Sequence, residues 1–424
     1  MEIFKFPQDI EGIEKKRLKN TFDFQDERSR VVEEIISTIQ VDGDKALFKY
    51  TREFDGADLE SLLVSQEEIE EAYRVVGDDY LSSLQRSIEN VASFHEKQLQ
   101  KSWFAYEGGM VGQLYIPLAR VGAYVPGGRA AYPSSVVMTV VPAKVAGVEE
   151  VVVVSPPDKE GKLNPYTLVA ARETGADEIY KVGGAQAIAA LALGTESIRR
   201  VDKIVGPGNI YVTLAKKLVY GLVDIDMLAG PSEILILADG TANTDFIAAD
   251  LLSQAEHDPL AVSTLITTDE KLAQLTLKAV KEQLKTLPKK EIASTALENN
   301  GSIIIVEDLE DGIGLVNLFA PEHFEMIVAE PFKYLGKIKN AGAIFIGEYS
   351  SEPLGDYMAG PNHVLPTGGT ARFASPLNTD DFIKKSSFIY YQQAELAAVK
   401  EDIIRLAELE GLDAPARAVK IRFQ

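Results

Sequence analysis

From Val121 onward the chain alternates short apolar runs with stretches of helical periodicity, and this alternation limits the possible folds more than any other feature. The clearest apolar run covers residues 151–154, and the runs at 179–182 and 203–205 follow it. Buried parallel strands with covering helices produce this pattern. We therefore expect an α/β fold with two doubly wound units and helical additions at both ends.

Turn and capping residues refine these expectations. Asn164 suits the N-cap of a helix that begins at Pro165, and Gly175 suits its left-handed end. Further helices are expected at 186–193, 210–219, 244–257 and 271–284, and further strands at 234–237, 262–267, 302–306, 324–328 and 343–346.

The segment before the first apolar run has a different texture. Residues from about Phe24 to Gln100 carry apolar side chains at helical spacing, with Gly43 as a break before a helix at 45–54. The tail from Leu377 to Gln424 is charged and partly helical in pattern.

Charge and cysteine content exclude several functions. The chain has 43 Lys and Arg against 64 Asp and Glu, so it repels polyanions and acidic membranes, and nucleic-acid binding is not expected. There is no cysteine, so any metal site must use nitrogen and oxygen ligands. No apolar run approaches the ~18 residues of a membrane span and the N-terminus lacks a signal-peptide pattern, so we expect a cytoplasmic protein.

The chain has four histidines, and two of them have chemically suggestive neighbours. Gln254 and His257 lie three residues apart in the expected helix 244–257, where one face could present them to a zinc ion. A histidine in the last turn of a helix is otherwise a partner of the helix dipole. Glu322 and His323 are adjacent and suit proton transfer, although a plain surface pair has the same pattern.

The remaining candidates are weaker by pattern alone. Asp356 lies in residues 352–361, a stretch too rich in glycine and proline for regular structure, where a loop could hold it toward a metal or simply form a turn. His95 is expected to be structural, and His363 lies in a turn-rich loop without a local chemical cue. Glycine-rich turns at 125–128, 183–186 and 205–209 follow apolar runs and suit phosphate binding, but the G-x-G-x-x-G fingerprint is absent.

Taken together, these segments resemble the histidinol dehydrogenase family along nearly the whole chain. The motifs that carry the resemblance are Tyr124-Val-Pro-Gly-Gly128, Gly183-Gly-Ala-Gln186, Gly206-Pro-Gly-Asn209, Ala229-Gly-Pro-Ser-Glu233, Ser253-Gln-Ala-Glu-His257, Ala320-Pro-Glu-His323, Gly355-Asp-Tyr357 and Asn362-His-Val-Leu-Pro-Thr367. The resemblance implies an NAD-dependent, zinc-assisted oxidoreductase that converts L-histidinol to L-histidine through L-histidinaldehyde with two NAD molecules, in the last step of histidine biosynthesis.

The resemblance also implies a role for each matching residue. Glu322 would activate water, and His323 would take the alcohol proton. The implied zinc ligands are Gln254, His257 and Asp356; the implied substrate contacts are these three with Ser232, His323 and Glu410; the implied NAD contacts are Tyr124, Gln186 and Asn209.

The architecture implied by the resemblance is a homodimer in which the tail reaches the partner. It would comprise an extension at 1–20, a first incomplete Rossmann-like domain at 21–123 plus 233–376, a second at 124–232, and the tail at 377–424. Incomplete Rossmann-like domains account for the missing glycine fingerprint.

One position departs from the family pattern. The family's tail motif ends in a histidine that completes the zinc shell, whereas this chain has Pro415 after Glu410-Gly-Leu-Asp-Ala414. Proline offers neither a side-chain ligand nor a backbone N–H. We expect a more weakly held zinc; the alternatives are a paralogous NAD-dependent dehydrogenase for another amino or hydroxy alcohol, and a catalytically impaired homologue with a binding or regulatory role.

Overall fold

The computed structural model describes residues 1–13, 27–127 and 131–424. These residues form two compact units. Unit 1 comprises residues 1–98 and 118–382, and unit 2 comprises residues 99–117 and 383–424. The predicted helix start near Phe24 and the predicted turn residue Gly128 lie outside the described residues.

Unit 1 contains the expected N-terminal helical section. Its helices are α2 (Glu27–Asp42), α3 (Asp44–Phe54), α4 (Gln66–Val75) and α5 (Asp78–Glu96). Gly43, with a φ of +53°, separates α2 from α3 as predicted, because this left-handed backbone is easiest for glycine. Ser65 caps α4 through a capping box with Glu68.

The first sheet of unit 1 has five parallel strands in the order β6-β5-β4-β7-β8. The strands are β4 (Arg120–Tyr124), β5 (Glu150–Ser155), β6 (Glu178–Lys181), β7 (Lys203–Val205) and β8 (Asp224–Ile225), and the helices between them are α6 (Pro133–Ala146), α7 (Pro165–Glu173), α8 (Gly184–Leu193) and α9 (Ile210–Val219). The strands and helices predicted in this region are confirmed, including the Asn164 cap and the left-handed Gly175.

This sheet is buried on both faces, as its valine-rich strands predict. Val152 and Val154 belong to a core that also includes residues of α2, α3, α8 and α9. Val151 and Val153 of the same strand are buried too, and α6 contacts β4 and β5.

The second sheet of unit 1 has six parallel strands in the order β1-β11-β10-β9-β12-β13. They are β1 (Glu2–Lys5), β9 (Glu233–Ala238), β10 (Val262–Thr267), β11 (Ser302–Ile305), β12 (His323–Ile327) and β13 (Ala343–Ile346), and the helices are α10 (Thr244–Ala255), α11 (Glu270–Leu284), α12 (Lys290–Asn300), α13 (Leu309–Phe319), α14 (Phe332–Leu335) and α15 (Glu352–Tyr357). The predicted strands are confirmed, whereas β1 was not predicted.

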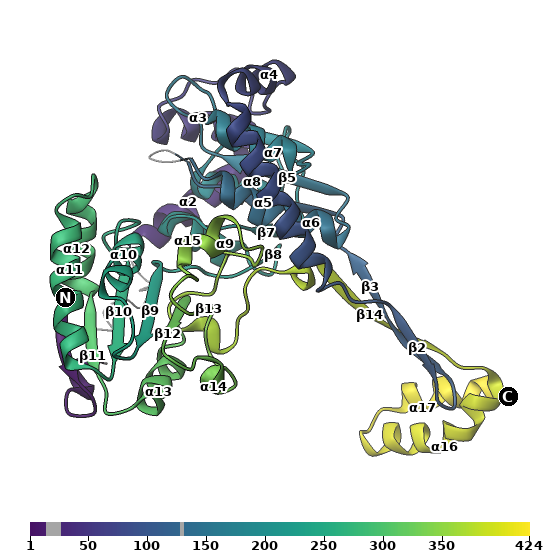
Figure 1. Ribbon diagram of the computed structural model, residues 1–424. Coiled ribbons are helices and arrows are strands. Elements are labelled where there is room, and N and C mark those ends of the chain that lie inside the picture. The colour runs from purple at the N-terminus through teal and green to yellow at the C-terminus, as the bar shows by residue number, and fades with distance from the viewer. Residues whose placement is uncertain (14–26, 128–130) are drawn as a thin grey trace. The chain divides into compact units, whose positions relative to one another are not determined.

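Helices cover both faces of this sheet, with α10, α11 and α12 on one face and α13 on the other (Figure 1). Ile234 and Ile236 pack with α10, α11 and α12, whereas Leu235 and Leu237 pack with α13. Side chains of a strand point alternately to opposite faces, so one strand supplies both cores. The predicted mixed α/β fold with parallel sheets is therefore confirmed.

Two short 3-10 helices, at Thr370–Arg372 and Thr379–Phe382, complete unit 1. Unit 2 contains an antiparallel ribbon in the order β14-β3-β2 and a helical tail. Its elements are β2 (Trp103–Tyr106), β3 (Met110–Pro117), β14 (Ile383–Tyr390), α16 (Gln393–Leu409), α17 (Asp413–Lys420) and a final 3-10 helix at Ile421–Phe423. The tail is partly helical, as predicted. The strand β14 at its start was not predicted. Its cross-strand partners lie more than 250 residues earlier, where no local pattern points to them.

Candidate active site

A cavity of about 1160 Å³ in unit 1 collects most of the predicted site residues. Its walls include loop residues that follow β4 and β7, at the carboxyl ends of the five-stranded sheet. They also include residues at the amino ends of β9 and β12 in the six-stranded sheet. The predicted site residues on its wall are Asn209, Ser232, His257, Glu322, His323 and Asp356.

The other predicted site residues do not line this cavity. Within the described residues, Tyr124, Gln186 and Gln254 are buried and do not belong to the wall of this cavity. Glu410 caps the C-terminal end of α16 in unit 2 and is exposed.

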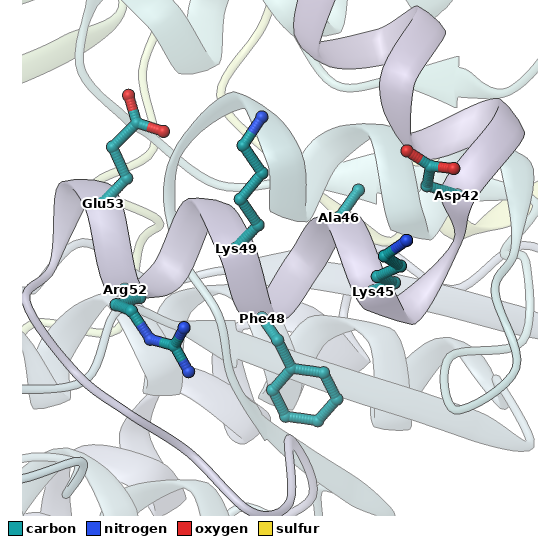
Figure 2. Close-up of a pocket in the computed structure, with 7 residues that line it drawn as sticks. All are labelled: Asp42, Lys45, Ala46, Phe48, Lys49, Arg52 and Glu53. Atoms are coloured by element: carbon teal, nitrogen blue, oxygen red, sulfur yellow. The ribbon is translucent and has the colours of Figure 1, made fainter.

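A second cavity, of about 780 Å³, runs along α3. Figure 2 shows its side chains, which combine both charge signs with the ring of Phe48. It holds no histidine and none of the residues singled out in the sequence, so the first cavity is the candidate active site.

The helix that carries Gln254 ends earlier than predicted. Helix α10 stops at Ala255, so His257 lies in the turn that follows instead of in the last helical turn. Asp258 precedes Pro259, and a residue before proline is disfavoured in helical conformation, which accounts for the early end. The N–H of His257 still donates to the carbonyl of Gln254 at 3.2 Å.

The prediction that residues 352–361 lack regular structure is wrong in its first half. Residues Glu352–Tyr357 form the short helix α15. Pro353 lies in its first turn, where a missing N–H costs nothing, so the sequence can be helical despite the proline. Because Glu352 and Asp356 are four residues apart on this helix, both carboxyl groups face the same side.

His323 is held as a neutral imidazole with one free nitrogen. Its Nδ1 lies 3.1 Å from the carbonyl oxygen of Glu233, which assigns the proton to Nδ1 because a carbonyl can only accept. Its Nε2 is buried, has no hydrogen-bond partner among the described residues, and lies 3.9 Å from a carboxyl oxygen of Asp356. Burial lowers the pKa of His323 to about 4, so Nε2 carries a lone pair at neutral pH.

Glu322 is fixed beside this imidazole. One of its carboxyl oxygens accepts the N–H of Glu233 at 2.8 Å and lies 3.7 Å from Nδ1 of His323. Burial raises the pKa of Glu322 well above its ordinary value, although the backbone hydrogen bond opposes the shift. The cavity therefore places a carboxyl group whose pKa is raised beside an imidazole whose pKa is lowered, and such opposite shifts are typical of acid–base sites.

The ligand atoms of His323, Glu352 and Asp356 lie within 4.8 Å of one another, close enough to surround one cation. Burial and mutual repulsion raise the pKa of Glu352 to about 7, and burial raises that of Asp356 to about 6. A divalent cation would offset this repulsion. His257 interacts electrostatically with both Glu352 and His323, which places it near the same cluster.

The donor set fits zinc. Both amide atoms of Gln254 are fully buried, and no described residue provides a hydrogen-bond partner for either atom. A buried polar group without a partner is costly, so an external partner for this amide is favoured. Imidazole nitrogen, carboxylate oxygen and amide oxygen are all available here, and the first two are common zinc ligands.

Glu352 and His363 were missed as site residues. Both line the cavity, and Nε2 of His363 has no partner within the described part of the chain. The spacing of four between Glu352 and Asp356 was a usable signal, but only for a helix, which the glycine and proline content had argued against. His363 carried no such signal.

A buried polar layer lies behind these residues. A carboxyl oxygen of Glu325 on β12 accepts the N–H of Glu352 at 2.9 Å, and Glu325 also hydrogen-bonds Asp250 on α10. Burial and the adjacent Asp250 raise the pKa of Glu325 to about 9. The hydroxyl of Ser253 donates to Glu352 at 3.1 Å. These contacts tie together α10, β12 and α15, the elements that carry the candidate ligands.

The predicted dinucleotide contacts lie at the carboxyl ends of β4, β6 and β7. The Tyr124 hydroxyl accepts the N–H of Gly184 at 3.2 Å, and Gln186 is buried in the first turn of α8. Asn209 caps α9 by accepting two backbone N–H groups. The amino ends of α8 and α9 both lie at this edge and favour anionic groups.

Comparison with known proteins gives a consistent result. The family model described as histidinol dehydrogenase matches residues 18–423. The histidinol dehydrogenase of Carboxydothermus hydrogenoformans is 58% identical over 92% of this chain and 93% of its own length. That of Caldanaerobacter subterraneus is 53% identical over 100% of this chain and 99% of its own.

A solved structure agrees with these sequence matches. The crystal structure of histidinol dehydrogenase from Elizabethkingia anophelis superposes with a TM-score of 0.94 at 39% identity, covering 100% of this chain and 98% of that one. No helix in the described part of the chain has the length and apolar character needed to cross a membrane.

Proposed function

This chain belongs to the histidinol dehydrogenase family, and from that premise we propose that it oxidises L-histidinol to L-histidine through L-histidinaldehyde, reducing two NAD molecules in turn. It is an NAD-dependent, zinc-assisted oxidoreductase of histidine biosynthesis. The observation that carries the proposal is the meeting of Glu322 and His323 with the Glu352–Asp356 face of α15 in one cavity. The family identities do not favour another alcohol or a silent homologue.

We assign His323 as the base of both oxidations. Its free Nε2 faces the cavity cluster, and its Nδ1–H is engaged by the carbonyl of Glu233. This arrangement holds the ring in the tautomer that accepts a proton at Nε2. Removing the hydroxyl proton at this atom would let the carbinol carbon give up hydride, which bound NAD would accept.

We assign Glu322 to the water that adds to the aldehyde. Its carboxyl group is buried beside His323 and is oriented by the N–H of Glu233. Addition of water gives the hydrated aldehyde, which is the species that a second hydride transfer converts to a carboxylic acid. A separate carboxylate for this step leaves His323 free to take the hydroxyl proton.

We propose that Gln254, His257 and Asp356 hold the zinc, and that Glu352 joins them in this chain because the tail offers Pro415 instead of histidine. Bound zinc would act as a Lewis acid and as a template for the substrate's imidazole and amine. Ser232 on the cavity wall and Glu410 in unit 2 are the further substrate contacts that we propose.

For NAD we propose Tyr124, Gln186 and Asn209, at the carboxyl edge of the five-stranded sheet. The five-stranded sheet, and the six-stranded sheet apart from β1, both have the strand order 3-2-1-4-5, which supports two incomplete Rossmann-like domains. We propose their bounds as 21–123 plus 233–376 and 124–232. The segment 1–20 would then be an extension and 377–424 a tail.

We also propose a homodimer in the cytoplasm, with the tail exchanged between protomers. Unit 2 exposes large apolar side chains, including Phe104 at 71%, Ile389 at 76% and Leu409 at 78%. Apolar surface of this kind favours contact with another protein surface. Sedimentation equilibrium of the full chain tests the stoichiometry.

The decisive experiment for the function is histidinol-dependent NADH formation with and without zinc. The protein is dialysed against a chelator, assayed, and assayed again after zinc addition. We expect activity to fall on dialysis and to return with zinc, because the donor set is complete only around a cation. Well-folded, zinc-loaded protein that forms no NADH from histidinol would contradict the proposal.

The assignment of Glu352 leads to a first prediction. Replacing Glu352 by glutamine keeps the volume of the side chain but removes a charged ligand, so we expect zinc affinity to fall about tenfold or more. Competition with a chelator of known affinity measures this without reference to activity. Glu348→Gln, in the loop before α15 and outside the cavity wall, is the matched control and should leave zinc binding unchanged. Equal affinity of Glu352→Gln and the unmodified protein would remove Glu352 from the ligand set.

A second prediction concerns the tail. Pro415 is exposed in the first turn of α17, where histidine is also compatible with the helix. Restoring the ligand with Pro415→His should raise zinc affinity about tenfold or more, because imidazole is a strong zinc ligand. Arg417→His on the same helix is the control for a merely additional histidine. An affinity that stays the same or falls would refute the proposed role of the tail.

A further inference from the structure

A buried ion pair lies beneath the loop that carries Asn209. Lys216 of α9 and Asp226, directly after β8, contact each other through Nζ and Oδ1, and their side chains are 3% and 1% exposed. A fully buried pair is costly to desolvate and is retained only when its remaining hydrogen-bonding capacity is used. What the pair binds therefore indicates its purpose.

Both charged groups bind the backbone of one residue, Gly206. The Lys216 ammonium donates to the Gly206 carbonyl at 3.0 Å. The second Asp226 oxygen accepts the Gly206 N–H at 2.7 Å. The two backbone polar groups of Gly206 are thus fixed by opposite charges, at the point where β7 ends and the Gly206-Pro-Gly-Asn209 loop begins.

The conformation of Gly206 makes this fixation necessary. Its φ is +108°, and a Cβ at this position would lie 2.2 Å from the carbonyl oxygen of Tyr124. Such close approach of two backbones is possible only with glycine, which is also the residue that loses most conformational entropy when it is ordered. The ion pair supplies two charge-assisted hydrogen bonds that offset this loss.

The pair also contacts the segment that leads to Ser232 on the cavity wall. Oδ1 of Asp226 accepts the N–H of Met227 at 2.6 Å, so Asp226 orients the chain that continues into Ala229–Ser232. The hydroxyl of Thr213, one turn before Lys216, donates to the Ala229 carbonyl at 3.2 Å. Residues from both segments, among them Asn209 and Ser232, line the candidate active site.

We infer that Lys216 and Asp226 are positioning residues that fix the Gly206–Asn209 loop in its dinucleotide-binding conformation before NAD arrives. This rests on the proposed function, in which Asn209 contacts NAD. Neither side chain lines the cavity, so the pair acts through the backbone of Gly206 and not by touching the cofactor. A loop that is already ordered binds more tightly, because its ordering entropy is not lost on binding.

The test is NAD affinity of the zinc-loaded, full-length protein by titration calorimetry. The double variant Lys216→Met with Asp226→Leu replaces the pair by apolar side chains, an exchange that buried ion pairs often tolerate. We expect the NAD dissociation constant to rise about tenfold or more, and kcat at saturating NAD to stay within about threefold, as for loss of a positioning group. Zinc content should not change.

Arg120→Met is the matched control. Arg120 is another buried cation of the same sheet, paired with Glu150 and Glu178 at the amino ends of the strands, opposite the loop. Its loss should lower thermal stability without changing the NAD dissociation constant. A folded double variant that binds NAD like the unmodified protein would overturn the inference.

A measurement on the unmodified protein decides the case if the double variant does not fold. Amide hydrogen exchange over residues 206–212 should be slow before NAD is added. Fast exchange that becomes slow only with NAD would overturn the inference, because the loop would then be ordered by the cofactor. Failure of the unmodified protein to bind NAD at all is a different result, which would contradict the proposed function instead.

Discussion

Replacing His323 by glutamine should lower kcat for histidinol oxidation by about 10²- to 10⁴-fold, the usual contribution of a general base. Glutamine can keep the contact with the Glu233 carbonyl through its amide N–H, but its remaining oxygen is far less basic than Nε2. The loss should appear equally in kcat and in kcat/KM, because the proton moves only in the transition state. Steady-state NADH formation over a range of histidinol concentrations measures it.

Two checks separate this chemical loss from a structural one. The variant should keep the far-ultraviolet circular dichroism of the unmodified protein and its NAD dissociation constant. His95→Gln provides a contrast, since His95 is fully buried, with its Nδ1 2.7 Å from the Val91 carbonyl in α5, and serves packing and hydrogen bonding. It should lower thermal stability and spare the catalytic step. Near-normal kcat in folded His323→Gln would end the assignment of the base.

Replacing Glu322 by glutamine should separate the two oxidations. The amide oxygen can still accept the Glu233 N–H, so the local structure is kept, but the group no longer removes a proton from water. We expect oxidation of supplied L-histidinaldehyde to fall by about 10²-fold or more, while the first hydride transfer is much less affected. Rapid-mixing measurement of NADH should then show one equivalent per site followed by a slow phase.

Product analysis provides the control for this second experiment. A carbonyl-trapping reagent should capture more aldehyde from Glu322→Gln than from the unmodified protein. Equal slowing of both oxidations would contradict a role confined to water, and would indicate that Glu322 acts on His323, which lies 3.7 Å away.

Much of the local structure followed from the sequence because it depends on near neighbours. The strand at Val262–Thr267 and the helix at Ile210–Val219 have the predicted bounds. Asparagine, glycine and proline at helix ends impose their preferences within one turn, so the Asn164 cap was predictable too. The errors at His257 and at α15 arose because the effect of a proline depends on its position. Pro259 follows the end of α10, whereas Pro353 lies in the first turn of α15, where a proline is compatible with a helix.

The candidate site was predictable in its members but not in its geometry. Resemblance to the family named Glu322, His323 and Asp356, and the structure places them on one cavity wall. Their roles stay predictions. Glu352 and the Glu325–Asp250 pair were missed, because burial and cross-element hydrogen bonds give them their significance, and neither quantity is visible in a local pattern.

What the sequence determined by itself is many of the helices and strands of the two parallel sheets, the absence of thiol chemistry, and the family, since all three follow from residue type and short spacing. What only the tertiary structure decided is which residues meet. Asn209 follows a strand of the first sheet, whereas Ser232 and His323 lie at the amino ends of strands in the second, yet all three line one cavity. Strand order and the packing of helices against both sheets produce that convergence. These depend on the burial of whole faces, which the periodicity of a single segment does not encode.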